Sequence, residues 1–220
     1  MAVAGRDIVG SGAVEQSPGS WCEGLRLFGL LTIGLVAMAL VILASAGWDT
    51  DGYRMVIRAT ARTSLTLFLS AFLATALLRL RPSAPTRWLH RNRRHLGLAF
   101  AVSHGVHLAA IITLATTDPT IFWTLASAAS IIIGGAGYLV IALLVATSFD
   151  RISTWLGARH WQQVTTVGAW FIWSLFVLIN GIRIPRNGWY LVPVAILVAS
   201  LVVRVKTRKV PTNVAHAALN

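Results

Sequence analysis

Two histidines, His104 and His107, fall near the middle of an apolar stretch that runs from about Leu96 to Ala115. Ionisable side chains at membrane depth are costly, and by default they indicate a functional site. A spacing of three residues places both on one face of a helix. Such a pair is consistent with haem iron ligation, with a proton-relay or metal role, or with hydrogen bonds that lock neighbouring helices.

Geometry restricts the haem interpretation. The two axial ligands of a haem approach the iron from opposite faces of the ring, so neighbours on one helix face cannot supply both. A bis-histidine haem would need a histidine on a second helix. The remaining histidines stand at one boundary of the apolar segments or in the carboxyl tail: His90, His95, His160 and His216. The residues therefore allow one haem at most, with His107 or His104 as its ligand.

Two arginines, Arg58 and Arg62, enter the second apolar segment from the side towards which the histidines are displaced. One interpretation is that they bind haem propionates by charge-assisted hydrogen bonds. The other is that they extend to the membrane interface, as long basic side chains do at helix ends. The sequence leaves both interpretations open for Arg62 and favours the interface for Arg58.

The elements that position these residues are membrane helices. Of the 220 residues, 56% are hydrophobic and 12% are charged, whereas soluble domains carry about 25% charged residues. Segments of roughly 20 apolar residues cross the hydrocarbon as helices. We predict an all-α, polytopic, six-helix bundle whose spans are 25–46, 59–80, 96–115, 121–147, 164–181 and 189–203.

The basic residues predict the topology. Five of the 19 Lys and Arg residues fall on one side of these spans, and the other 14 fall on the side of the two termini. An excess of Lys and Arg marks the cytoplasmic side, so both termini are expected in the cytoplasm. Residues 1–22 are expected to be a disordered tail, residues 23–205 the membrane domain and residues 206–220 a cytoplasmic tail. One cysteine, Cys22, excludes an intrachain disulfide.

Small residues recur in the fourth predicted span, at Ala126, Ser130 and Gly134, and then at Gly135 and Gly137. A small-residue face allows close helix packing in membranes. It could also provide a flat seat for a cofactor ring. We favour packing.

Several short motifs of the chain resemble those of a known family. The run Arg93-Arg94-His95-Leu96-Gly97-Leu98, followed by His107, resembles the ferric-reductase-like transmembrane domain, in particular the membrane haem-binding subunits of bacterial methionine sulfoxide reductase systems. Thr147-Ser148, Trp155-Leu156-Gly157 and Trp161 also match. The likeness covers roughly residues 53–205, in the expected six-helix order.

The resemblance implies that His107 is a haem b ligand. It also implies a multi-pass protein of the bacterial inner membrane that passes electrons from a quinol or flavin donor to an acceptor. The family would supply one or two histidines on the fifth span. This chain has Thr165 at the first of those positions and Leu178, Ile179 and Asn180 around the second.

Three hypotheses follow. The protein binds one haem b through His107 or His104, or it is a haem-free scaffold or partner-binding subunit, or the histidines bind a quinone head group or a metal. Expected partners are the lipid bilayer and a redox partner protein or a quinone. Nucleic acid is not expected, because the basic residues cluster beside apolar spans. We find no nucleotide-binding motif, so flavin or nicotinamide chemistry would belong to a partner chain.

Overall fold

The computed structural model describes residues 22–208, and all regular secondary structure in that range is helical. The predicted amino-terminal tail, apart from Cys22, and the last 12 residues of the carboxyl tail lie outside the described residues. The helices are α1 (Gly24–Ala46), α2 (Thr50–Leu80), α3 (Ala84–Arg91), α4 (Arg93–Thr117), α5 (Pro119–Leu125), α6 (Ala128–Ala146), α7 (Asp150–Gly181) and α8 (Leu191–Arg208), with short 3-10 turns at Ile184–Arg186 and Gly188–Tyr190.

The prediction of six spans is confirmed. Within the described range, six helical segments are long and apolar enough to cross a membrane, and each predicted span overlaps one of them. Their outward surfaces are rich in large aliphatic side chains, such as Ile33, Ile132 and Leu139, which are 68%, 72% and 75% exposed. An apolar surface of this kind is stable against lipid tails. The chain is therefore a multi-pass integral membrane protein.

The fourth predicted span needs a correction, because residues 121–147 do not form one helix. The chain leaves the helical conformation at Ala126 and Ser127, between α5 and α6. Ser127 and Ser130 form a capping box, in which each hydroxyl accepts the backbone N–H of the other residue. A capping box satisfies the free N–H groups that begin a helix. Ala126 therefore precedes α6 and is not part of its small-residue face.

Two other helices begin earlier than their predicted spans. The carboxylate of Asp49 accepts the N–H groups of Asp51 and Gly52, and this cap begins α2 nine residues before Ala59. Helix α7 begins at Asp150 and is broken at Gly157, where φ is 73°. Glycine reaches positive φ without the steric cost that other residues meet, so the chain bends there before it enters the membrane segment.

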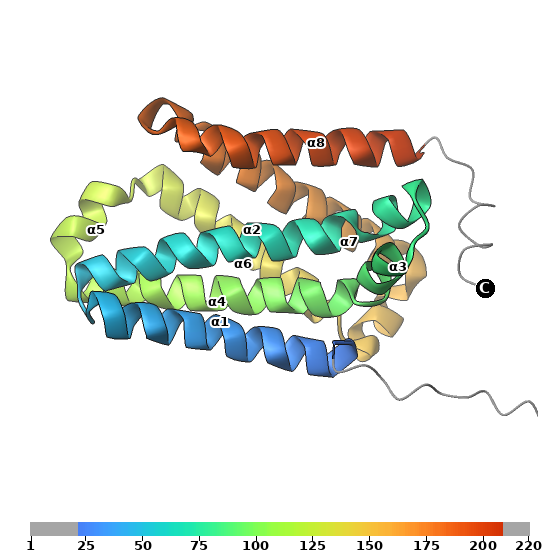
Figure 1. Cartoon of the computed structure of the whole chain (residues 1–220), viewed down its shortest axis with the longest axis horizontal. Coiled ribbons are helices and arrows are strands. Elements are labelled where there is room, and N and C mark those ends of the chain that lie inside the picture. Colours follow the sequence, from blue (N-terminus) through green and yellow to red (C-terminus); the bar gives the residue numbers. More distant parts are fainter. Residues whose placement is uncertain (1–21, 209–220) are drawn as a thin grey trace, which may run out of the picture.

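Figure 1 shows α2 and α4 lying side by side, with α1 beside them, while α6 and α7 lie behind and α8 packs on α2 and α7. The beginning of α1 and the end of α8 lie at the same end of the bundle, at the right of the view. We call this the basic end, and the other the opposite end. Five helices contribute to the main core: Phe68, Leu69 and Phe72 from α2, Phe100 from α4, Ile141 from α6, Ile172 from α7 and Leu197 from α8.

Candidate functional site

Helix α4 carries both histidines, and their rings lie near each other with centroids 5.7 Å apart, as the spacing of three residues predicts. The Nδ1 atom of His107 lies 2.9 Å from the hydroxyl oxygen of Thr60 on α2. Thr60 is fully buried, and its hydroxyl also lies 2.7 Å from the backbone carbonyl of Val56. A carbonyl oxygen only accepts, so the single hydroxyl proton goes to Val56 and the Nδ1–H of His107 donates to Thr60. This tautomer leaves a lone pair on Nε2 of His107.

The contact between His107 and Thr60 belongs to a longer seam of hydroxyl groups between α2 and α4. The Ser103 hydroxyl lies 2.8 Å from that of Ser64 and 3.2 Å from that of Thr63. Ser64 and Ser103 are both fully buried. Hydrogen bonds between helices substitute for water at membrane depth. The seam therefore fixes the register of α2 against α4 and, through it, the position of the His107 ring.

His104 has different surroundings. Its ring lies among aromatic rings from three helices, with centroid distances of 4.7 Å to Phe100, 5.8 Å to Tyr138 and 6.0 Å to Phe176. Neither its Nδ1 atom nor the Tyr138 hydroxyl, both buried, has a hydrogen-bond partner among the described residues. We call Phe100, Tyr138 and Phe176, which surround His104, the aromatic shell.

The two arginines named above do not contact the histidines in the described structure. Arg58 and Arg62 are exposed, whereas Thr60 between them is buried. Two residues along an α-helix correspond to about 200° of rotation. Both arginines therefore project from the side of α2 opposite to the Thr60–His107 contact. The positive charge of Arg183, just beyond the end of α7, instead acts on His107 by repelling the protonated form of its ring.

The fifth span offers no second ligand at the positions that the resemblance indicates. The Thr165 hydroxyl donates to the backbone carbonyl of Trp161 at 2.8 Å. The Asn180 side-chain amide donates to the carbonyl of Phe176 at 2.8 Å. Leu178 has no donor atom in its side chain and is 45% exposed. Both polar side chains are thus bonded to the backbone of their own helix.

The glycines of α6 support the packing interpretation at one position. A Cβ atom on Gly137 would lie 2.9 Å from Leu175 on α7, so this glycine allows close approach of the two helices. At Gly134 and Gly135 such an atom would meet nothing within 4 Å. The close contact is therefore local and does not extend along the whole small-residue face.

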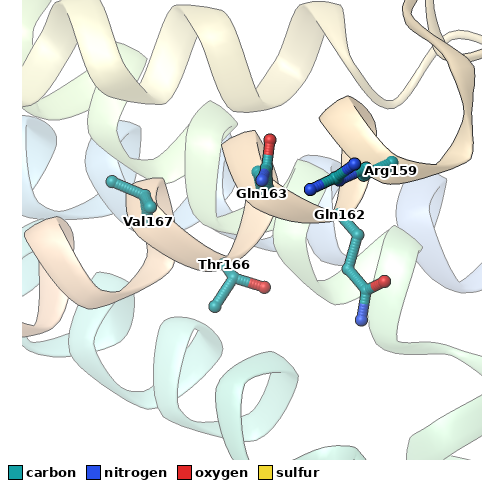
Figure 2. A pocket seen from close by; sticks show the side chains of 5 residues that line it. All are labelled: Arg159, Gln162, Gln163, Thr166 and Val167. Atoms are coloured by element: carbon teal, nitrogen blue, oxygen red, sulfur yellow. The ribbon is translucent and has the colours of Figure 1, made fainter.

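A surface recess lies elsewhere, on α7 near the basic end. Figure 2 shows the five side chains that line it, Arg159, Gln162, Gln163, Thr166 and Val167, all from this one helix. Neither candidate histidine lines the recess. In residues 22–208 no group of three or more His, Cys, Asp or Glu side chains could hold a metal ion. Multidentate metal binding is thus unsupported in that range, and the histidine pair remains the candidate site.

Sequence reasoning missed Thr60, Tyr138 and Arg183. For Thr60 a signal existed, because Thr60, Ser64 and Phe68 recur every four residues in the second predicted span, and Val56 continues the pattern just before it. Hydroxyl residues on such a stripe indicate a helix-facing surface in membranes. No comparable pattern marks Tyr138 or Arg183, whose positions depend on how α6 and α7 pack against α4.

Searches against family models, curated proteins and solved structures found no match for this chain.

The described residues fit a haem at one ligand position only. Thr60 orients the imidazole of His107 through Nδ1, and in its neutral form this ring would offer the Nε2 lone pair to iron. The other described histidines, apart from His104, lie towards the basic end in α3, in the first turn of α4 and in α7. The donor set is therefore that of a haem with a single histidine ligand.

Proposed function

We propose that this protein is a membrane haem b electron-transfer protein in which His107 is the one histidine ligand. The observation that carries the proposal is the hydrogen bond from His107 to the buried Thr60. A hydrogen bond on the remote ring nitrogen fixes the tautomer and orientation of a ligating histidine, and it increases the basicity of the ligand. The resemblance in the run 93–98 supports the same assignment.

Each residue around His107 has a defined task in this proposal. Thr60 keeps the Nδ1 proton in place and directs Nε2 away from α2. Phe100 and Phe176 exclude water from the neighbouring volume, which lowers the local dielectric. Arg183 supplies a positive charge suited to a propionate carboxylate. When bound, haem would supply one-electron transfer between the Fe(II) and Fe(III) states.

The proposed setting is the bacterial inner membrane, with both termini in the cytoplasm, as the distribution of Lys and Arg predicts. The electron donor would be a quinol or a flavin carried by a partner chain. A redox partner protein would accept the electrons.

One observation favours a second candidate function. The aromatic shell packs His104 against rings from α4, α6 and α7, at distances that belong to a filled core. A haem-free subunit that serves as a membrane scaffold or binds a partner would have such a core.

A visible absorption spectrum of the purified protein from haem-replete cells separates the two functions. We expect a Soret band in the wild-type protein, its loss in His107→Ala and its retention in His104→Ala. Thr60→Val should lower haem affinity by about tenfold to a hundredfold, as loss of an outer-shell partner does. Colourless wild-type protein would refute the haem proposal and favour the scaffold. Equal loss in both histidine variants would show that His107 has no special role.

A further inference from the structure

The first turns of α7 form a short amphipathic segment that precedes the membrane part of this helix. Its apolar side chains recur at intervals of three or four residues: Phe149, Ile152, Trp155 and Leu156. Such spacing places them on one face of a helix. Phe149 is 57% exposed and Trp155 is 85% exposed. Two large aromatic side chains that project from one face indicate an interaction surface.

The other face of the segment is polar. Asp150, Arg151 and Thr154 are exposed there. The Oδ1 atom of Asp150 lies 3.1 Å from the guanidinium of Arg94, in the first turn of α4. Ile152 follows Asp150 by two residues, which is about 200° around the helix. The apolar face therefore points away from this ion pair, and the segment has the two-sided pattern of a helix at an apolar boundary.

Two contacts set the level of this segment relative to the membrane. Arg94, which pairs with Asp150, stands just before the predicted span 96–115. The indole N–H of Trp161 donates at 2.9 Å to the backbone carbonyl of Thr147, the C-cap of α6. The chain thus leaves the membrane domain at Thr147 and has returned to the same level at Trp161. The segment between them lies at the membrane boundary of the basic end, where Figure 1 shows the start of α7.

We propose that this segment lies in the lipid–water interface at the basic end, with Phe149 and Trp155 inserted among the lipids of that leaflet. Aromatic rings are favoured at this level, and an amphipathic helix lies there with its apolar face towards the acyl chains. The bend at Gly157, where φ is 73°, separates the segment from the axis of the membrane helix. The occupant is the bilayer, because the next large exposed apolar side chain along α7 is Val167, within the membrane span. The proposal does not depend on haem binding.

The test places a nitroxide label on either face of the segment, in the full chain in liposomes of phosphatidylcholine and phosphatidylglycerol in equal amounts. Cys22→Ser removes the one native thiol, and Trp155→Cys or, as the matched control on the polar face, Thr154→Cys then provides the labelling position. Electron paramagnetic resonance measures collisions of the label with oxygen, which concentrates in lipid, and with a nickel chelate, which stays in water. The ratio of oxygen to nickel collisions should be severalfold higher at position 155 than at position 154.

A second measurement keeps the native aromatic ring. Phospholipids that carry bromine in the upper part of the acyl chains quench tryptophan fluorescence on contact. If Trp155 lies among the lipids, Trp155→Phe removes a quenched emitter, so the quenched fraction of the total emission should fall in the variant. If Trp155 lies in water, the same substitution removes an unquenched emitter and that fraction should rise.

Three results would overturn the proposal. Frequent nickel collisions at both labelled positions would show that the segment projects into water. Rare collisions with both reagents at position 155 would show that protein covers the apolar face, such as a second copy of this chain. A quenched fraction that rises in Trp155→Phe would place the native ring in water. Because Thr154 and Trp155 are both exposed, the labelled proteins should elute in gel filtration as the wild-type protein does.

Discussion

The interface between α2 and α4 and the interface between α6 and α7 are built differently. Helix α2 buries ten residues, among them Thr60 and Ser64, which bond to α4 through hydroxyl groups. Helices α6 and α7 bury two residues each, and their contact rests on glycines that admit leucines from the other helix. Polar hydrogen bonds specify one relative position of two helices, whereas van der Waals packing at small residues mainly sets the distance between them.

This difference matters for the candidate site. His107 stands on the hydroxyl-bonded side, where its ring is held in one orientation by Thr60. The family that the chain resembles would place its second ligand on the fifth span, which is α7. Near Gly168, α7 contacts α6 through van der Waals packing against Leu144. Helix α7 carries no histidine within the predicted span 164–181. The half of the site with a ligand is thus the half whose geometry is specified by hydrogen bonds.

The largest expected change comes from disrupting the α6–α7 interface. A Cβ atom on Gly168 would lie 2.9 Å and 3.2 Å from two carbon atoms of Leu144. Gly168→Val should therefore lower the free energy of unfolding by about 1–3 kcal/mol, the usual cost of overpacking. Unfolding in mixed detergent micelles, followed by tryptophan fluorescence, measures it.

Gly135→Val is the matched control, because a Cβ atom there meets nothing within 4 Å. It introduces the same β-branched side chain into the same pair of helices, so changes in helix propensity cancel. If both variants unfold alike, the close approach of α6 and α7 does not stabilise the bundle. The Gly168→Val protein should retain the contact between His107 and Thr60, and with it any Soret band.

A smaller change is expected from the hydroxyl seam. Ser103→Ala leaves the buried hydroxyl of Ser64 without its 2.8 Å partner. The expected loss is about 1 kcal/mol of unfolding free energy, and a double-mutant cycle with Ser64→Ala should give a coupling of about 0.6 kcal/mol. Ser174→Ala is the control, since that exposed hydroxyl bonds only to its own helix. A Ser103 variant as stable as the Ser174 variant would show that the seam does not stabilise the bundle.

The sequence predicts some parts of this structure well, for physical reasons. Apolar segments of membrane length must be helical, so the six spans follow from hydropathy. Hydropathy does not reveal a break in a helix when the residues at the break are themselves small or apolar. The interruption at Ala126 and Ser127 was therefore not predicted. The capping pair Ser127 and Ser130 was the available signal. The early start of α2 likewise depends on the Asp49 cap, which lies outside any apolar window.

The candidate site likewise has one part that the sequence predicts and another that depends on helix packing. Spacing alone places His104 and His107 on one face of α4. The identity of their neighbours depends on which helices meet, and local sequence does not determine this. Arg58 and Arg62 illustrate the limit, because their depth follows from their position in the chain but their direction follows from the packing of α2. The structure directs Thr60 towards α4 and both arginines outwards.

The smallest expected effect concerns the junction of α2, α3 and α4 at the basic end, where Thr75 lies 3.4 Å from Nδ1 of His90 and accepts a hydrogen bond from Arg93. Burial, followed by the nearby charges of Arg93 and Arg79, lowers the pKa of His90 below its ordinary value. Below about pH 6.5 the unfolded chain then binds a proton that the folded chain resists, so this residue reduces stability as the pH falls.

His90→Gln removes the titratable imidazole and should make the melting temperature less sensitive to acid. Between about pH 7.5 and pH 5.5, on either side of the ordinary histidine pKa, the wild-type melting temperature should fall further than that of the variant. The difference should be small, because His90 is only partly buried and solvent screens its neighbours. Parallel curves for the two proteins would mean that His90 titrates alike in the folded and unfolded chains. The hydroxyl contact with Thr75 would then have no part in the pH response of this junction.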